Sequence, residues 1–554
     1  MSNVSPPSWA RAEIRALCIA LGCMAALWLA AINLGTFGTP DTDLRLRMAH
    51  AWWSGEPEVN PNLSPPASRE QVEYGVVGAK GERLIFYEPG QSWLMVPSDW
   101  VGAKLSRYFK TVTSKELRTA VVVWTLFLPI NVAVVLAAFW LLIELKVEPR
   151  LAALSTLVWL LGTTVLPYAQ VAFQNNQVLL CVLVANAAVL EWSGRQRAVF
   201  LIVSGVAAGS AMLLRATSAI HVATIGLFLI VVLCMTVRPN WNRLRALGWW
   251  TLGFVPLAIL GRVFDHFRYG GFLTTGQSLW ISIRNADPIF AGLPQLTASP
   301  FTNPASDGIL GVLFSPAKSI LLYDPLLLPC LLCIVFIWKR LTPFVRWYIF
   351  FAGLNLVLHI GLTSRMAFWH GDGAWAARYH VTSVQLLLLP ILPYLVQAAV
   401  SRSGGWAWPI RLCIALAVAT QAIAVAMPYE AEIAPEYIAT YPDCDQETWE
   451  THRGPRLEAR IVNLYCVLGS SRSALCEDPP VVTEAEKKPL CEGALHDLRS
   501  NKRLAFFPYN PTYALASRVS WIVWALASVF AFATTLFWCR GVIQEMRAPR
   551  PRSA

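Results

Sequence analysis

The sequence predicts an all-α polytopic membrane protein, and three observations lead to this fold class. Of the 554 residues, 55% are hydrophobic and only 14% are charged, whereas soluble domains carry roughly 25% charged residues. The mean hydropathy of the chain is +0.48. Several uncharged runs approach the ~20 residues that a helix needs to cross a ~30 Å hydrocarbon core. These observations exclude a soluble globular protein.

About twelve apolar runs have the composition of membrane-spanning helices. They lie at about 16–34, 119–143, 151–168, 177–192, 198–214, 218–236, 246–263, 320–338, 344–362, 381–400, 410–427 and 519–538. We expect three parts in the chain: a transmembrane domain over 1–427, an external loop or cap over 428–518, and a last transmembrane helix with a basic cytoplasmic tail over 519–554.

Positive charge alternates between successive loops. The net charge is +11, but the basic residues are spread over short loops rather than gathered in one patch, so we expect no nucleic-acid partner. By the positive-inside rule the basic loops and both termini face the cytoplasm. The segments then predicted to be external are 35–118, 169–176, 264–319, 363–380 and 428–518.

The twelve cysteines divide into two groups. Eight lie in or at the end of apolar runs, where packing residues are expected. The other four are confined to the predicted external segment 428–518 and are Cys444, Cys466, Cys476 and Cys491. An even number of cysteines in an oxidising compartment predicts two disulfides, with three possible pairings. A zinc site is less favoured because no close C-x-x-C pair occurs there.

Ionisable residues are scarce in the middle of the predicted spans. An ion-coupled transporter or pump places such residues deep in its helices. A flippase for lipids or lipid-linked sugars also needs a polar path, so the scarcity argues against both classes. We expect the chemistry at the external ends of the spans instead.

Two carboxylates, Asp41 and Asp43, follow the first predicted span and precede a helix-forming run. One interpretation is structural: either acid caps the helix, and Asp43 pairs with Arg47 at i+4. The other is catalytic, since a carboxylate at the membrane surface can act as a general base on an acceptor hydroxyl. Residue pattern alone leaves both open.

Further motifs accompany these acids. Asp41 is followed by a small residue, Ala49, and by Gly55, and a Pro-Gly-bearing stretch begins at Tyr87. The later motifs are FQNNQ at 173–177, FRYGGFLTTGQS, GILGVLFSPAKSILLYDPLLL and FWHGDGAWAARYHVTSVQLLLLP. Together they resemble the membrane-embedded GT-C glycosyltransferases that use polyprenyl-phosphate sugars, such as bacterial aminoarabinose transferases and protein O-mannosyltransferases. The resemblance extends to about residue 400.

Two features depart from that family. Many relatives have Asp-Glu where this chain has Asp41-Thr42-Asp43, and the loop with four cysteines is not a general family feature. The resemblance implies a GT-C-like fold with membrane-parallel helices in its external loops. It also implies catalytic roles for Asp41 and Asp43, with either acid as the base.

The resemblance further implies a sugar donor on a polyprenyl phosphate, whose leaving phosphate needs cations. Substrate-binding candidates are Arg378, Arg215, Lys318, Arg284, Tyr87, Trp369 and Asp372. Arginine binds phosphate through its planar fork. The alternative is an interfacial cation that extends to lipid headgroups. His370 and Asp372 are two possible metal ligands in a Gly-rich turn, which is too few to predict a metal. We expect no cofactor and no essential metal.

The function implied is an inverting glycosyltransferase in the inner (plasma) membrane, with its active site facing the periplasm or exterior. Its partners would be the lipid-linked donor, membrane lipids, and an acceptor lipid, glycan or protein. Two alternatives remain open. One is a polymerase or ligase of lipid-linked glycans, and the other is a non-catalytic envelope-assembly or lipid-flipping protein.

Overall fold

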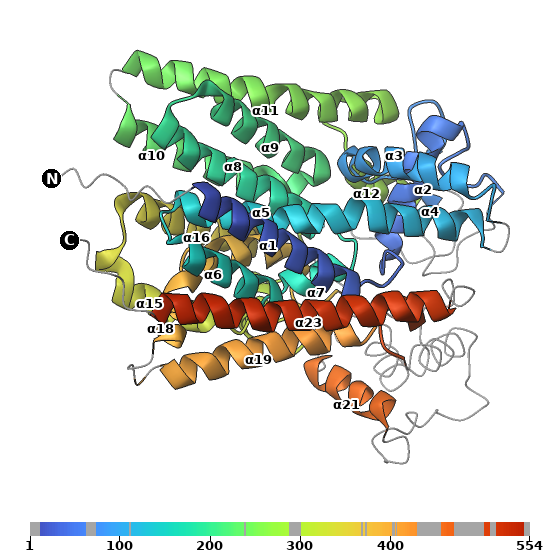
Figure 1. Ribbon diagram of the computed structural model, residues 1–554. Helices are drawn as coiled ribbons and strands as arrows, with labels where there is room; N and C mark the ends of the chain where they lie inside the picture. Colours follow the sequence, from blue (N-terminus) through green and yellow to red (C-terminus); the bar gives the residue numbers. More distant parts are fainter. Residues whose placement is uncertain are drawn as a thin grey trace.

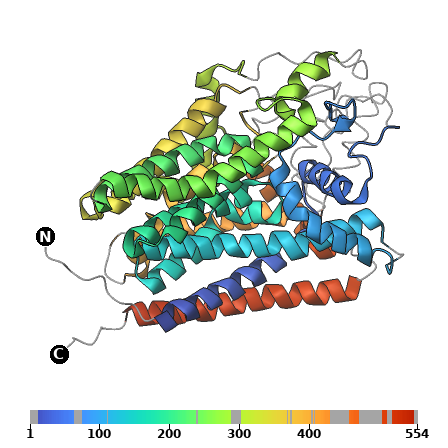
Figure 2. The ribbon, with the colours of Figure 1, turned by 90° about the horizontal axis from the view of Figure 1, so that it is seen from above.

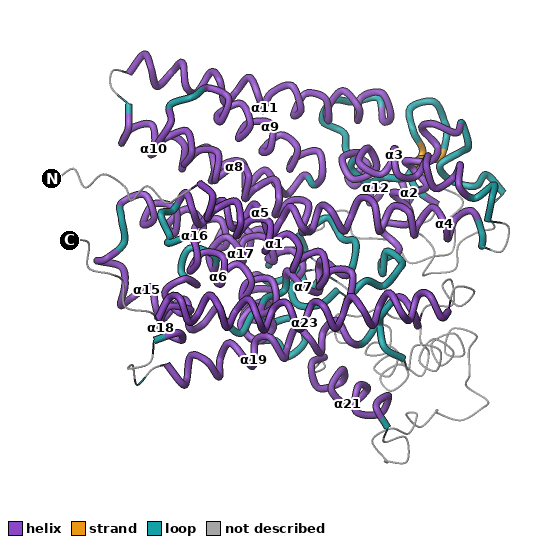
Figure 3. Tube along the Cα trace, in the orientation of Figure 1, coloured by secondary structure: helices purple, strands orange, loops and turns teal. Residues whose placement is uncertain are grey.

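The structure, a computed structural model, is almost wholly helical (Figure 1, Figure 3). Within the described residues, strands β1 (Val76–Val77) and β2 (Arg83–Leu84) form one antiparallel hairpin. The structure describes residues 11–62, 74–109, 112–237, 240–286, 301–366, 369–371, 374–401, 405, 407–428, 456–469, 503–509 and 517–547. The predicted all-α class is confirmed.

In chain order, the described α-helices are α1 (Arg11–Ala31), α2 (Pro40–Ser54), α3 (Pro89–Leu105), α4 (Ser114–Val122), α5 (Leu128–Glu144), α6 (Pro149–Gly162), α7 (Val165–Gln170), α8 (Asn175–Arg195), α9 (Ala198–Leu214), α10 (Ala219–Thr236), α11 (Asn240–Tyr269), α12 (Gly276–Ala286), α13 (Ala305–Phe314), α14 (Ile320–Tyr323), α15 (Leu327–Ile337), α16 (Pro343–Thr363), α17 (Val381–Leu388), α18 (Leu392–Val400), α19 (Ala407–Ala426), α21 (Arg456–Leu468) and α23 (Ser517–Arg547). A π-helical turn, Val123–Phe127, joins α4 to α5.

Eight helical segments in the described part of the chain are long and apolar enough to cross a membrane. A ninth is added if α17 and α18, which meet at 60°, form one bent span. The eight are Arg11–Ala31, Ser114–Glu144, Asn175–Arg195, Ala216–Thr236, Trp241–Tyr269, Pro343–Thr363, Ala407–Ala426 and Arg518–Arg547. The chain is therefore a multi-pass membrane protein.

The expected twelve spans are not confirmed, because three predicted spans are short helices. Helix α6 has 14 residues and α9 has 17. The third run, 320–338, breaks between α14 and α15 at Asp324. This buried carboxylate accepts hydrogen bonds from the backbone and hydroxyl of Thr164 and from Gln385. Counting apolar residues along a run measures its hydrophobicity. The count does not detect a break in the helix that such a polar contact stabilises.

The centre of the bundle is apolar and so is much of its outer surface. Most residues of α8 are buried, and α8 packs against α5, α9 and α10. Large apolar side chains on α11 and α23 are instead exposed, for example Ile259 at 54% and Phe537 at 77%. Apolar side chains on an outer face suit helices that contact lipid.

Three charged residues lie together at one end of the bundle. Arg150, at the start of α6, pairs with Glu13 of α1 at 2.9 Å and with Glu545 of α23 at 3.2 Å. Helices α1 and α23 also run side by side (Figure 1, Figure 2). The first described helix therefore begins at the end of the bundle where the last described helix ends.

The opposite end carries α2, α3, α12, α21 and the β-hairpin, and we call it the distal end (Figure 1). The helix expected after the first span is present there as α2, and most of the Pro-Gly-bearing stretch that begins at Tyr87 forms α3. Of the predicted cap, 456–469 and 503–509 are described. The eight cysteines of the apolar runs are free thiols, whereas Cys466 on α21 is not among them. Because Cys444, Cys476 and Cys491 lie outside the described residues, the disulfide pairs stay a prediction.

Candidate functional site

The candidate site is built around the first turn of α2. Proline suits the first helical position because it has no N–H to satisfy there. Pro40 occupies that position, and Thr39 precedes it as the N-cap residue. Neither Asp41 nor Asp43 is therefore the cap, so the capping interpretation is wrong in its simplest form. Both acids lie in the first turn, where a helix dipole still favours negative charge.

Asp41 contacts two side chains that come from distant parts of the sequence. Tyr87 donates its phenol O–H to Asp41 Oδ1 at 2.8 Å. Arg378 Nη1 lies 3.5 Å from Asp41 Oδ2. Both members of this ion pair are partly exposed, Asp41 by 27% and Arg378 by 17% of the side chain. The contact is single and long, which is weaker than a bidentate pair.

The surrounding positive charge keeps Asp41 ionised. Burial alone would raise the pKa of Asp41, but the charges of Arg378 and Arg45 and the hydrogen bond from Tyr87 outweigh it. The pKa of this carboxyl is therefore held below its ordinary value of 3.8. Burial and the neighbouring charge of Asp41 raise the pKa of Tyr87, so its phenol keeps the proton that it donates.

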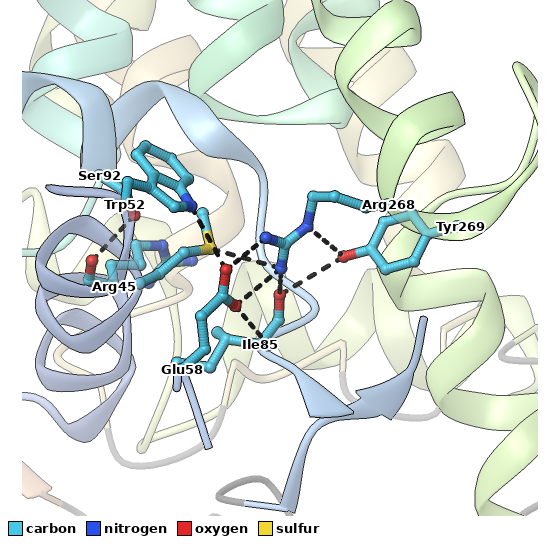
Figure 4. A network of polar contacts seen from close by, with 8 residues as sticks. Arg45, Trp52, Glu58, Ile85, Ser92, Arg268 and Tyr269 are labelled. Carbon is cyan, nitrogen blue, oxygen red and sulfur yellow. Dashed lines mark hydrogen bonds and ion pairs between the residues drawn. The ribbon is translucent and has the colours of Figure 1, made fainter. Parts of the chain in front are cut away.

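The segment that carries Tyr87 is held by a buried ion pair between Glu58 and Arg268 (Figure 4 shows the pair). Arg268, near the end of α11, binds both carboxylate oxygens of Glu58 at 2.5 and 2.8 Å. The same guanidinium donates to the carbonyl of Ile85, two residues before Tyr87. The segment that carries Tyr87 is therefore held against α11 by a fully paired charge network.

Gly90 brings the start of α3 against the end of α9. A Cβ on Gly90 would lie 2.6 Å from the carbonyl carbon and oxygen of Leu213. No other residue tolerates such a close approach without a shift of backbone. Arg215, two residues after Leu213, is consequently brought toward the segment that carries Tyr87.

Arg378 is placed by contacts with two other segments of the distal end. Its carbonyl accepts a hydrogen bond from the amide of Asn175, in the FQNNQ motif. Its guanidinium lies over the ring of Phe173 from the same motif, at 5.3 Å, and over the ring of Tyr379 at 5.3 Å. A Cβ on Gly371 would lie 2.6 Å from Cγ of Arg378, so the chain also needs glycine at this position.

Two more arginines complete the positive surroundings of Asp41. Arg215, at the end of α9, lies 4.8 Å over the ring of Tyr379. Arg378 lies over the same ring. Arg45, one turn after Asp41 on α2, lies 3.9 Å over the ring of Tyr87. The Nε of Arg45 is buried and has no hydrogen-bond partner among the described residues. We call Arg45, Arg215 and Arg378 the arginine cluster.

Sequence reasoning missed Arg45, although one signal was available. Asp41 and Arg45 are four residues apart, so they share one face of a helix that begins at Pro40. The contact of Arg45 with Tyr87 could not be predicted, because Tyr87 lies in a different segment.

The remaining candidates lie in other surroundings. Asp43 is partly exposed and pairs with Lys115 at 3.7 Å. Lys318 is fully buried and donates to the carbonyl of Ala374 at 2.6 Å, so it supports the loop that leads to Arg378. Trp369 is 4% exposed, and its ring packs against Gly311. A Cβ on Gly311 would lie 2.0 Å from that ring, so no larger residue fits there.

Two further candidates cannot be placed. Asp372 and the side chain of Arg284 lie outside the described residues. His370 is described and buried, and burial together with the charge of Lys318 lowers the pKa of its imidazole to about 3. Among the described residues, no group of three or more His, Cys, Asp or Glu side chains is arranged to hold a metal ion.

Comparisons with known proteins give matches among solved structures. No family model matches the chain, and no curated protein matches it at a significant level. Among solved structures, the fold is similar to the crystal structure of ArnT from Cupriavidus metallidurans bound to undecaprenyl phosphate. The match covers 95% of this chain and 79% of that chain, with 15% sequence identity and a TM-score of 0.41. This likeness concerns the course of the helices and assigns no residue.

Proposed function

We propose that this protein is a membrane glycosyltransferase that moves a sugar from a polyprenyl phosphate to an acceptor hydroxyl at the distal end. The observation that carries the proposal is the convergence of one ionised carboxylate, Asp41, with the three positive charges of the arginine cluster. Glycosyl transfer from a phosphate needs these two functions: a base for the acceptor and cations for the leaving group. The sequence motifs of the GT-C family support the same assignment.

In the proposed reaction Asp41 takes the proton of the acceptor hydroxyl. The hydroxyl oxygen forms a bond to the anomeric carbon from the face opposite the phosphate. The bond between that carbon and the phosphate oxygen breaks, and its electron pair leaves with the polyprenyl phosphate. The configuration at the anomeric carbon is therefore inverted.

The arginine cluster would meet the charge that develops on the phosphate. A sugar linked through a phosphodiester carries one negative charge, and the leaving polyprenyl phosphate gains negative charge as the bond breaks. The three arginines exceed the charges of Asp41 and of the nearby Glu88, so the site has a positive surplus that suits a phosphate. An arginine fork can bind two phosphate oxygens at once.

Arg378 would connect donor binding to the activation of the base. Its single 3.5 Å contact with Asp41 is weak enough to be exchanged for a phosphate. Once Arg378 turns to the phosphate, Asp41 loses its nearest counter-ion. A carboxylate without that counter-ion has a higher pKa and is a stronger base.

The location is part of the proposal. The basic loops predict that the end with Arg150 faces the cytoplasm and that the distal end faces the periplasm or exterior. Tyr87, Phe173, Arg268 and Arg378 all come from segments predicted to be external, and their contacts bring those segments together at one end. The donor tail would then lie in the lipid beside the distal end.

A second candidate function is favoured by Arg45. A polymerase or ligase of lipid-linked glycans releases a pyrophosphate, which carries more negative charge than a phosphate. The third arginine, with its buried Nε, adds positive charge beyond Arg215 and Arg378. Donors linked through phosphate and through pyrophosphate therefore form the two arms of one assay.

The test uses the purified full chain in lipid nanodiscs. Synthetic polyprenyl-phosphate and polyprenyl-pyrophosphate sugars are supplied with envelope lipids, glycans and proteins as acceptors, and the released polyprenyl lipid is measured by mass spectrometry. We expect turnover of a phosphate-linked donor by the parent protein and a loss of ~100-fold or more in Asp41→Asn. Glu82→Gln, in the exposed turn of the hairpin, is the matched control. Turnover by Asp41→Asn equal to that of the parent would overturn the mechanism.

A further inference from the structure

A second carboxylate lies beside the candidate site and takes no part in the proposed reaction. Glu88 follows Tyr87 directly and is the N-cap residue of α3, but its side chain forms no capping hydrogen bond. The residue is half-buried. Within the described part of the chain, its carboxylate makes no hydrogen bond or close ion pair. Such a carboxylate retains the capacity to accept several hydrogen bonds.

The sequence neighbours of Glu88 contact two parts of the site. On one side, Tyr87 donates its hydrogen bond to Asp41. On the other side, Gly90 packs against the end of α9, next to Arg215. The negative charge of Glu88 acts on Arg215 and also on Asp265 of α11. Glu88 therefore directly follows the residue that contacts the proposed base, and its charge acts on one of the proposed phosphate-binding cations.

In the proposed reaction the transferred sugar would lie close to these residues. Its anomeric carbon is bonded to the phosphate before transfer and to the acceptor oxygen afterwards. The sugar ring consequently lies between the arginine cluster, which holds the phosphate, and Asp41, which holds the acceptor. Sugar hydroxyls are hydrogen-bond donors, and carboxylate oxygens accept such bonds strongly.

We propose that Glu88 accepts hydrogen bonds from hydroxyl groups of the transferred sugar and thereby selects the donor. The inference rests on the proposed function, because it assumes that the arginine cluster holds the donor phosphate. It adds a residue for which the sequence motifs implied no role. The carboxylate contributes to recognition of the sugar and not to recognition of the phosphate.

The test measures binding rather than turnover. Polyprenyl phosphate with and without its sugar is titrated onto the full chain in nanodiscs, and the bound lipid is quantified by native mass spectrometry. We expect Glu88→Ala to weaken binding of the sugar-bearing lipid by ~10-fold or more, since hydrogen bonds to charged groups are strong. Binding of the sugar-free lipid should remain within ~2-fold of the parent, as should both lipids with the control Glu82→Ala.

A donor that lacks one hydroxyl sharpens the test. If Glu88 binds that hydroxyl, its removal weakens binding to the parent but not to Glu88→Ala, and one of a series of deoxy donors should show this coupling. An equal change for both lipids in Glu88→Ala would mean that Glu88 acts only through the field at Arg215, and no change would mean that it acts on neither. Both results overturn the inference. Failure of the parent to bind either lipid would instead overturn the proposed function.

Discussion

Two ion pairs at the distal end differ in burial and geometry, and the difference indicates which pair stabilises the fold and which can bind a ligand. Glu58 and Arg268 form a bidentate pair whose side chains are 6% and 9% exposed. Asp41 and Arg378 form one contact of 3.5 Å, and both remain partly exposed. Glu58 and Arg268 neutralise each other, and Arg268 also donates to a backbone carbonyl. The Asp41–Arg378 pair keeps capacity for a ligand, so the looser pair is the better candidate for function.

The largest expected effect concerns the stability that the bidentate Glu58–Arg268 pair gives to the fold. Glu58→Gln keeps the shape of the side chain but leaves Arg268 as a buried charge without its counter-ion, which costs ~3 to 5 kcal/mol. We therefore expect a clearly lower thermal midpoint of unfolding in detergent. Asp41→Asn, the isosteric change in the Asp41–Arg378 pair, should keep a thermal midpoint close to that of the parent. If both variants melt alike, the contrast between the two pairs has no energetic basis.

The next effect concerns donor use. Arg378→Lys retains a positive charge but loses the planar fork, which lies over the rings of Phe173 and Tyr379. We expect kcat/KM for the donor to fall ~10-fold or more, because a lysine cannot bind two phosphate oxygens in the same way. Expression and folding should be unchanged. A kcat/KM equal to that of the parent would make Arg378 an ordinary interfacial cation.

A third effect is a shift in the pH profile. Because positive charge lowers the pKa of Asp41 below 3.8, the acid limb of kcat/KM should lie below that value in the parent. Arg378→Gln removes the nearest charge, so the pKa of Asp41 should rise and the limb should move to higher pH. Arg378→Lys should move it less. A limb that stays in place in Arg378→Gln would indicate that Asp41 is not the titrating base.

The smallest expected effect is at Asp43. Its contact with Lys115 is partly exposed and 3.7 Å long, and such surface pairs contribute ~0 to 1 kcal/mol. Asp43→Asn should therefore change turnover by less than ~3-fold and leave the thermal midpoint nearly unchanged. The transfer assay with phosphate-linked donors measures this directly. A loss greater than that of Asp41→Asn would move the general base to Asp43.

Local sequence predicted the helix that follows the first span, which is present as α2. Proline at the first helical position explains why α2 begins at Pro40 and α3 at Pro89. The same local reasoning failed for the cap, because Thr39 rather than an aspartate occupies that position. It also missed Asp324, whose hydrogen bonds interrupt an otherwise apolar run.

Sequence by itself determined the membrane class, because transfer of apolar side chains into lipid depends on composition and run length. Sequence also proposed Asp41, through its position after the first span and the motifs that accompany it. Only the tertiary structure decided which cations meet that acid. Arg378 and Lys318 were both candidates from the sequence, yet Arg378 contacts Asp41 whereas Lys318 is buried against a backbone carbonyl. Their difference arises from packing between segments hundreds of residues apart, and no local window of sequence contains that information.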